Sequence, residues 1–512
     1  MNKTKTKKAK KMNMNTFKLL MAGCGVGVAA ALTAVAYRYA LGFAEEARTG
    51  MFESVNSPLG AAAVFAVLII LGLITGYITQ KEPMIKGSGI PQVKGQLLGY
   101  FAPSWLSIMI KKFITGTLCI FAGLSLGREG PSVQLGAMAG QGFAEVTGIN
   151  GGDRKYLIVC GACAGLAAAF NAPLAGLMFA LEEIHKNFSR KAIFPAMAAA
   201  MCADAVSKLF FGTDAVLHMV QIEMPPMKYY LLYIVLGAVC GVFGAIYNKT
   251  LFVVQKLYKK IPVSDTIRIA IPFAIAGVVG FTFPAIMGGG HGLIDMLAGG
   301  TAALSLMIML LIGKFIFSMI SFCSGAPGGI FFPLLVLGAL AGSIVGRVSV
   351  MTLGIPESYV VNFMLLGMAG LFSGIVRAPL TGIVLVAEMS GSFTQFMGLA
   401  MVSCVSWLVA YMLKSRPVYE QMLDNIAPDH VGTEEEELDT ALMEMVIPFG
   451  SPVDGVSIKN LGLPANCHIV DIERRGVSLI PNGSTYIKSG DVLKVAYKVG
   501  YEKEVRNSFG IN

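Results

Sequence analysis

Two similar stretches decide how this 512-residue chain folds: GREGPSVQLGAMAG at 127–140 and SGAPGGIFFPLLVLGALAG at 324–342. In each, Gly and Pro come immediately before an apolar segment rich in small residues. The last ten residues of the two stretches share six identities, at an offset of 202. APLAGL (172–177) and APLTGI (378–383) recur in the same order at an offset of 206. The chain is therefore predicted to hold two related halves, with generic small-residue packing as the alternative explanation.

The composition around these stretches is that of a polytopic membrane protein. Hydrophobic residues make up 55% of the chain and charged residues only 14%, whereas soluble domains carry about 25% charged residues. Apolar segments recur from 19–43 to 393–413, and several are shorter than the roughly 20 residues that a spanning helix needs. Short segments broken by Gly and Pro predict half-helices that end inside the membrane.

Charge divides the chain into four regions. Residues 1–18 hold seven Lys and no acid, which favours a cytoplasmic N-terminus over nucleic-acid binding because an apolar segment follows at once. Residues 19–424 form the membrane domain. Residues 425–440 are an acidic linker that includes Glu434–Glu437. Residues 441–512 are predicted to form a small soluble α/β domain.

Strand patterns mark this last domain. The runs 443–448, 468–481 and 491–498 alternate apolar and polar residues as strands do, and 501–509 is predicted to be a closing helix. A turn is expected at Arg475–Gly476.

Three Gly/Pro motifs in the membrane domain predict an anion site. GSGIP (87–91), GREGP (127–131) and GGIFFP (328–333) each precede a helix. Free N–H groups at a helix start bind anions without a fixed positive charge. The hydroxyl groups of Ser88 and Tyr419, the latter in RPVYE, would add two neutral donors.

Acidic residues near these motifs predict proton chemistry. Glu129 lies between two apolar stretches, and intramembrane acids are functional by default. Its carboxylate can occupy the same donor-lined position as a free anion, and protonation would release it. A structural pair with Arg128 is the alternative. Glu182 and Glu183 end the helix that carries APLAGL, where a position at the water interface is an equally good interpretation.

These motifs, in this order and spacing, resemble the CLC family of chloride channels and chloride/proton antiporters. The resemblance covers about 57–424 and includes AGLAAAFNAPLAG at 164–176. It implies an all-α homodimer in which each subunit has its own pore, built from two inverted halves with broken helices. It also implies a role for six residues: chloride binding by Ser88, by the amides of Ile330 and Phe331 and by Tyr419, gating and external proton transfer by Glu129, and internal proton transfer by Glu183.

The resemblance favours the antiporter branch. Family channels usually carry an apolar residue at the position of Glu183, so the acid here predicts an exchanger of chloride for protons. A passive voltage- or pH-gated chloride channel is the alternative. Ser88, where nitrate-preferring members tend to have Pro, favours chloride. Gln92 and Lys94 occupy positions at which some relatives have acids. The ionisable groups along the pathway are therefore expected to differ from those of such relatives.

The C-terminal region, from GSPVDGVSIKNLGLP (450–464) through IPNGSTYIKSGDVLKV (480–495), resembles the RCK C-terminal (TrkA-C) domain of potassium-transport regulators. Such domains are usually regulatory and dimeric, and some bind small ligands such as nucleotides; no ligand signature is recognisable here. A potassium transporter is disfavoured because the membrane part has no TVGYG run.

The chain is not expected to be an enzyme, because no HExxH motif, paired Asp motif or Ser/His set lies in the apolar segments. No metal or cofactor is expected. The predicted protein is a multi-pass cell-membrane homodimer with both termini in the cytoplasm. Its predicted partners are chloride, protons, membrane lipids and an unidentified small ligand on the C-terminal domain, but not nucleic acid.

Overall fold

The computed structural model describes residues 16–186, 188–213, 216–217, 225–300, 302–428, 440–464, 467–474, 477–498 and 502–509. The chain divides into two compact units, Met1–Ile426 and Ala427–Asn512. The lysines of the N-terminal run up to residue 11, the acidic run Glu434–Glu437 and the expected turn at Arg475–Gly476 lie outside the described residues.

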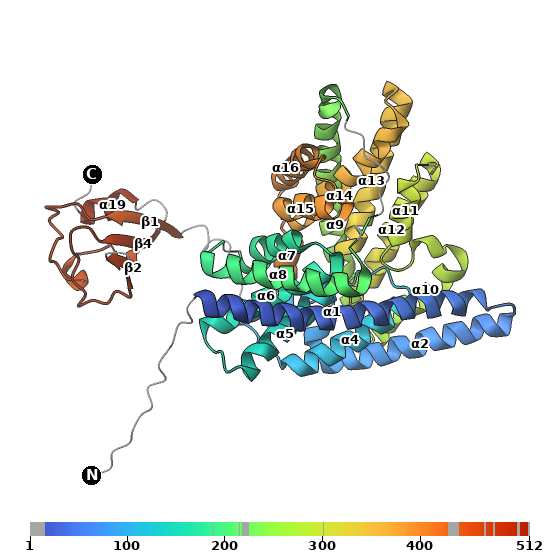
Figure 1. Cartoon of the computed structure of the whole chain (residues 1–512), viewed down its shortest axis with the longest axis horizontal. Helices are drawn as coiled ribbons and strands as arrows, with labels where there is room; N and C mark the ends of the chain where they lie inside the picture. Colours follow the sequence, from blue (N-terminus) through green and yellow to red (C-terminus); the bar gives the residue numbers. More distant parts are fainter. Residues whose placement is uncertain are drawn as a thin grey trace, which may run out of the picture. The chain divides into compact units, whose positions relative to one another are not determined.

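The described residues of the first unit form helices joined by short connections (Figure 1). Its α-helices are α1 (Thr16–Glu53), α2 (Pro58–Lys81), α3 (Ile90–Leu98), α4 (Trp105–Phe121), α5 (Glu129–Val146), α6 (Gly152–Phe170), α7 (Pro173–Phe179), α8 (Arg190–Phe211), α9 (Tyr230–Lys260), α10 (Asp265–Thr282), α11 (His291–Ala298), α12 (Leu304–Cys323), α13 (Phe331–Leu353), α14 (Val360–Val376), α15 (Pro379–Ser390), α16 (Phe396–Met412) and α17 (Val418–Ile426). A wide π turn, η2 (Ala180–His185), extends α7.

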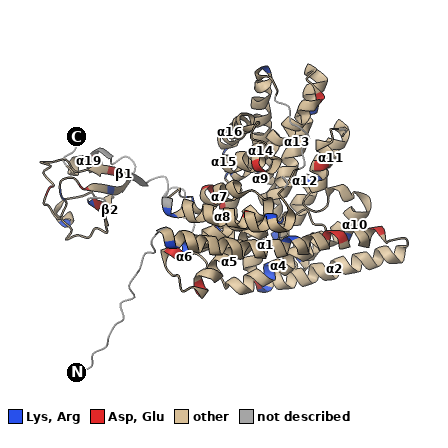
Figure 2. Cartoon of the chain, viewed as in Figure 1, with Lys and Arg blue, Asp and Glu red and all other residues tan. Residues whose placement is uncertain are grey.

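Eight helical segments of the described chain are long and apolar enough to cross a membrane. In contrast, α3, α7, α11 and α17 have only seven to nine residues and cannot cross one alone. The predicted mixture of spanning and broken helices is therefore confirmed. Charged residues are sparse along these helices (Figure 2).

Two apolar runs, 155–184 and 358–387, are each interrupted in the same way. Asn171 ends α6 with a φ of 50°, and Arg377, 206 residues later, ends α14 with a φ of 69°. A proline then occupies the first position of the next helix, α7 or α15, where its missing N–H costs nothing. The repeat seen in the sequence thus extends to the positions at which the helices break.

Close helix packing follows the repeat as well. In the first half α5 packs against α6, and in the second half α13 packs against α14. A methyl group on Gly136 would collide with the carbonyl oxygen of Gly161, and one on Gly338 with that of Gly367. Glycine lets both helix pairs approach backbone to backbone, as small residues do in membrane proteins. Around this centre, α1 lies against α8 and α2 against α10 (Figure 1).

The second unit is a small antiparallel sheet with a closing helix. Its strands β1 (Thr440–Val446), β2 (Cys467–Arg474), β3 (Val477–Leu479) and β4 (Val492–Lys498) pair in the order β1-β4-β2-β3. The helix α19 (Glu502–Ser508) buries Val505 against the sheet, together with Phe509. The predicted strand run 468–481 is therefore the β2–β3 hairpin, and the predicted closing helix is present.

Candidate functional site

The three Gly/Pro motifs meet at the centre of the first unit. Gly127 and Gly329 exchange main-chain hydrogen bonds of 2.7 and 2.8 Å, and Gly328 N–H donates to the Gly87 carbonyl at 3.0 Å. A methyl group on Gly130 would lie 3.0 Å from Ser88 Cβ and 3.1 Å from Gly329 Cα. The helices α3, α5 and α13 therefore begin around one point, with their N–H groups gathered there, as an anion site requires.

Glu129 is the first residue of α5 and is fully buried. Its carboxylate lies beside the main-chain N–H groups of Glu129 itself and Phe332, without a well-formed hydrogen bond to either oxygen. The nearest cation is Arg128, whose Nε lies 3.9 Å from Glu129 Oε1. The pairing with Arg128 that the sequence offered as the alternative is therefore present as a long ion pair without a hydrogen bond from Nε. The carboxylate also occupies a position lined by the amides of two helix starts.

The other expected anion ligands lie around the same point. Ser88 is buried, and its Oγ accepts the Ile90 N–H at 3.3 Å at the start of α3. Ile330 and Phe331 form the first turn of α13, where N–H groups have no partner within the helix. The Tyr419 hydroxyl on α17 is buried and has no hydrogen-bond partner among the described residues, and α17 packs against α3.

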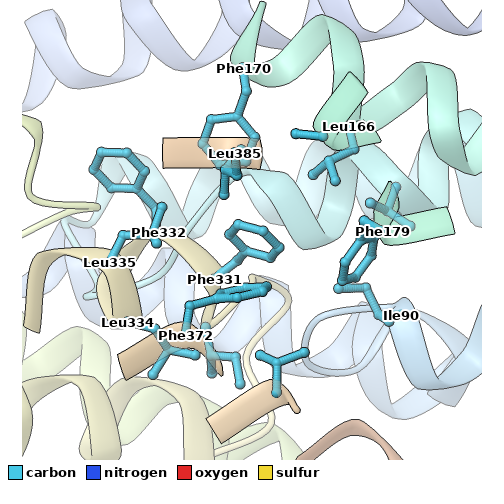
Figure 3. Packing of buried hydrophobic residues seen from close by; sticks show 14 of the residues in the cluster. Ile90, Leu166, Phe170, Phe179, Phe331, Phe332, Leu334, Leu335, Phe372 and Leu385 are labelled. Atoms are coloured by element: carbon cyan, nitrogen blue, oxygen red, sulfur yellow. The ribbon is translucent and has the colours of Figure 1, made fainter. Parts of the chain in front are cut away.

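Aromatic rings fix these ligands in place. The Phe331 ring lies among those of Phe170, Phe179 and Phe372, with centroid separations of 5.4, 5.6 and 4.7 Å (Figure 3). Phe179 also contacts the Tyr419 ring edge to face at 6.3 Å. Because the surroundings of the site are apolar, a small ion bound there can interact only with the few polar groups that point toward it.

Two cavities that share no lining residue reach this group of residues, one at Ser88 and the other at Glu129. One, of about 240 Å³, is lined by Ser88 together with Lys86, Lys259, Arg268 and the end of α17. The other, of about 200 Å³, is lined by Glu129, Arg128, Arg38 and His291, whose ring stacks on Phe332 at 3.8 Å. The first cavity is lined by three cationic side chains and by no acid, whereas the second carries Arg38 and Arg128 together with Glu45 and Glu129. Cationic side chains attract anions.

The second predicted proton-transfer residue, Glu183, is buried in η2 and ion-paired. Its Oε1 lies 3.0 Å from Lys94 Nζ, which in turn lies 3.8 Å from Glu420 Oε1. Glu420 also pairs with Lys186. Side-chain exposure rises along this series from 4% at Glu183 to 29% at Glu420 and 47% at Lys186. The charged groups thus link a buried carboxylate to the protein surface.

Glu182 has a different environment from its neighbour. Its oxygens accept the N–H groups of Leu380 and Thr381, at 3.2 and 2.7 Å, at the start of α15. In the other half, Glu388 accepts the N–H groups of Leu174 and Ala175, at 3.0 and 2.7 Å, at the start of α7. Each half therefore caps a short helix of the other, which is favourable because a carboxylate stabilises a helix N-terminus.

Sequence reasoning missed both of these caps and a pair of buried lysines. Lys112 donates to the carbonyl groups of Ile85 and Gly87, and Lys314 donates to those of Ile286 and Gly288, all within 3.0 Å. The signal was present in the repeat: Lys314 follows Lys112 at the offset of 202, and Glu388 follows Glu182 at the offset of 206.

Comparisons with known proteins agree with this architecture. The family described as "Voltage gated chloride channel" matches residues 71–411, and the "TrkA-C domain" matches residues 442–510. The chain is 36% identical over 398 residues to "H(+)/Cl(-) exchange transporter ClcA" of Vibrio parahaemolyticus serotype O3:K6, covering 76% of this chain and 85% of that protein. It is 35% identical over 397 residues to the protein of the same name from Vibrio campbellii, with the same coverage.

Solved structures share the fold. The chain resembles "a slow cyanobacterial Cl-/H+ antiporter" with a TM-score of 0.77 and 26% identity, covering 82% of this chain and all of that one. It also resembles "a CLC-type fluoride/proton antiporter" with a TM-score of 0.66 at 23% identity, over 80% of this chain and 98% of that one. Helices, motifs and comparisons agree that the chain belongs to the voltage-gated chloride channel (CLC) family, with a TrkA-C domain at its C-terminal end.

Proposed function

We propose that this protein is a secondary active transporter that exchanges chloride for protons across the cell membrane. The observation that carries the proposal is the position of Glu129: its buried carboxylate lies beside helix-start amides and lines one of two separate cavities, while Ser88 lines the other. The relatives named above are H(+)/Cl(-) exchange transporters, and their activity is transport rather than a chemical conversion.

In this mechanism chloride and the Glu129 carboxylate compete for the same amides. Chloride that enters past Ser88 is held by the Ser88 and Tyr419 hydroxyls and by the amides of Ile330 and Phe331. When Glu129 is ionised, its carboxylate occupies the outer part of the site and closes it. When Glu129 binds a proton its charge is lost, so chloride takes its place and the proton enters the protein with the side chain.

The proton then needs a second acceptor on the other side of the chloride site. Glu183 fits this role, because it lies at the end of the ion-paired series Glu183, Lys94, Glu420 and Lys186. A channel needs no such acceptor, so the buried acid favours exchange over a passive voltage- or pH-gated pore.

The cavity lined by Ser88, called the inner cavity below, supports a proposal for the sides of the membrane. It brings together the basic end of α9, Lys86 and the last residues of α17. Lys256, Lys259 and Lys260 occupy the last two turns of α9, and basic residues are enriched on the cytoplasmic side of membrane proteins. We infer that this cavity opens to the cytoplasm and that the C-terminal domain is cytoplasmic. The lysines of residues 1–18 favour a cytoplasmic N-terminus as well.

The assembly proposed is a homodimer, with one complete ion pathway in each subunit. The family likeness supports this proposal. The TrkA-C domain is proposed to regulate transport by binding an unidentified small ligand.

The test is transport in liposomes. A chloride gradient imposed across vesicles that contain the purified protein should drive protons against their own gradient. Glu129→Gln should conduct chloride at a rate nearly independent of pH and should move no protons. Uphill proton movement by the Glu129→Gln variant would remove Glu129 from the mechanism.

A further inference from the structure

A third cavity, away from the ion pathway, lies between α9 and the connection from α16 to α17. It is a groove of about 630 Å³. On α9 its lining residues recur every three or four positions, so they form a single stripe along the helix. The stripe begins with Val242, Ala245 and Ile246 and continues through Lys249 and Val253 to Lys256. One end of the groove is therefore apolar and the other basic.

The opposite wall adds more positive charge. Leu413, Lys414, Ser415 and Arg416 line it, and Lys414 holds a left-handed backbone with a φ of 54° in the turn that ends α16. Asn248 fixes this turn to α9, because its Nδ2 donates to Ser415 Oγ at 3.2 Å and to the Arg416 carbonyl at 3.1 Å. These hydrogen bonds hold the basic residues of the turn close to the basic residues of α9.

Three of these cations have no counter-ion in the described part of the chain. Arg416 pairs with Asp424 at 2.7 Å, but Lys249, Lys256 and Lys414 make no ion pair with any described acid. The described residues that line the groove include no Asp or Glu. In addition, Asn248 is 3% exposed and its Oδ1 has no hydrogen-bond partner among the described residues. The groove therefore offers both uncompensated positive charge and a buried acceptor.

The position of Lys249 along α9 favours one kind of anion for the groove. It lies 11 residues before the end of α9, or about 16 Å along the helix, and Val242, Ile246 and Val253 on the same stripe are exposed apolar side chains. A lysine at this depth is near the edge of the hydrocarbon core, where an unpaired charge is costly. The anion available at that depth is the phosphate of a lipid headgroup.

We propose that this groove binds one anionic phospholipid, with its phosphate among Lys249, Lys256 and Lys414 and its acyl chain along Val242, Ala245 and Ile246. The buried Asn248 Oδ1 would accept a hydrogen bond from a headgroup hydroxyl. Basic pockets between membrane helices on the cytoplasmic side suit anionic headgroups. The apolar continuation of the stripe favours a lipid over a free phosphate, which would leave that surface uncovered.

Native mass spectrometry of the full-length protein in detergent tests the proposal. The probes are dioleoyl phosphatidylglycerol and, as the zwitterionic control, dioleoyl phosphatidylcholine. The test variant is Lys249→Gln/Lys256→Gln/Lys414→Gln. The matched control is Lys155→Gln/Lys191→Gln/Lys228→Gln, which removes the same charge from exposed lysines outside the groove.

The wild type and the control should retain one phosphatidylglycerol per chain in preference to phosphatidylcholine. Each lysine near a headgroup is worth roughly a fivefold change in affinity, so the test variant should bind on the order of 100-fold more weakly. Equal retention by the test variant and the control would overturn the proposal. Glycerol 3-phosphate or inorganic phosphate that binds as tightly as the lipid would overturn the lipid assignment.

Photo-cross-linking keeps the proposal testable if the triple variant does not fold. A phosphatidylglycerol with a photoreactive acyl chain, added to the wild-type protein in liposomes, should label peptides of α9 and the α16–α17 connection. Excess unlabelled phosphatidylglycerol should remove the label, and excess phosphatidylcholine should not. Label spread evenly over all membrane helices would contradict a specific site.

Discussion

Gly127 and Gly329, 202 residues apart, hydrogen-bond to each other through both of their main-chain groups. They are equivalent residues of the two halves, so the axis that relates the halves locally lies between them. The bond pair fixes the starts of α5 and α13 side by side, and this places the Glu129 carboxylate next to the amides of the second half. The proposed gate is thus built at the junction of the repeats.

Ser88→Pro should change which anion the protein prefers. The substitution removes a hydroxyl that lines the inner cavity and whose Oγ accepts the Ile90 N–H, and it stiffens the loop before α3. No positive charge is lost, so the total anion flux should persist while nitrate gains relative to chloride. Parallel flux assays with the two anions measure this. An unchanged nitrate-to-chloride ratio would count against Ser88 as a ligand.

Lys94→Met should slow proton movement more than chloride movement. Lys94 is the link between the buried Glu183 and the partly exposed Glu420, so its loss disconnects the carboxylate from the surface. We expect a loss of about tenfold in coupled proton flux, which corresponds to about 1.4 kcal/mol, with Lys94→Arg retaining most of it. Proton flux is measured in liposomes at a fixed chloride gradient. Equal slowing of both ions would make Lys94 a structural residue.

Glu388→Ala and Glu182→Ala should destabilise the protein by similar amounts. Each carboxylate accepts two N–H groups of a short helix in the opposite half, and removing such an acceptor costs about 1–3 kcal/mol. Glu357→Ala is the control, because that side chain is 69% exposed; its ion-pair partner Arg347 is 15% exposed. Thermal unfolding in detergent gives the comparison. Variants at 182 and 388 as stable as the control would show that the caps contribute nothing.

The C-terminal domain should lose stability in acid through Asp491. Burial alone would raise the pKa of this carboxyl, but the Arg474 guanidinium and the Lys488 N–H donate to it and hold its pKa below the usual range. A lowered pKa in the folded state contributes stability above about pH 4, which is lost as the pH falls through the folded value.

Asp491→Asn should remove part of this dependence. Hydrogen exchange of β2 and β4 amides in the full-length protein at pH 7 should be faster in this variant than in the wild type. Asp471→Asn is the control, because Asp471 also lies on β2 but pairs with Ser478 and Lys494 rather than with Arg474. Identical exchange in all three proteins would contradict a stabilising Arg474–Asp491 pair.

Much of this architecture could be predicted from the sequence because the information is local. Gly/Pro motifs mark helix starts, short apolar runs mark broken helices, and the offsets of 202 and 206 relate the halves. Contacts between distant charged residues were not predictable in this way. Lys94 and Glu183 are 89 residues apart, and only the packing of α3 against η2 brings them together. The roles of Ser88, Tyr419, Glu129 and Glu183 rest on the family likeness, and their transport functions stay predictions.

The most direct test of the exchange mechanism is simultaneous recording of chloride and proton flux from one set of liposomes. The wild type should move protons uphill on a chloride gradient. Glu183→Gln should still move chloride but no protons, whereas Glu182→Gln, which alters the neighbouring acid that caps α15, should keep both fluxes coupled. A wild type that never moves protons against their gradient would contradict exchange and make the protein a chloride channel.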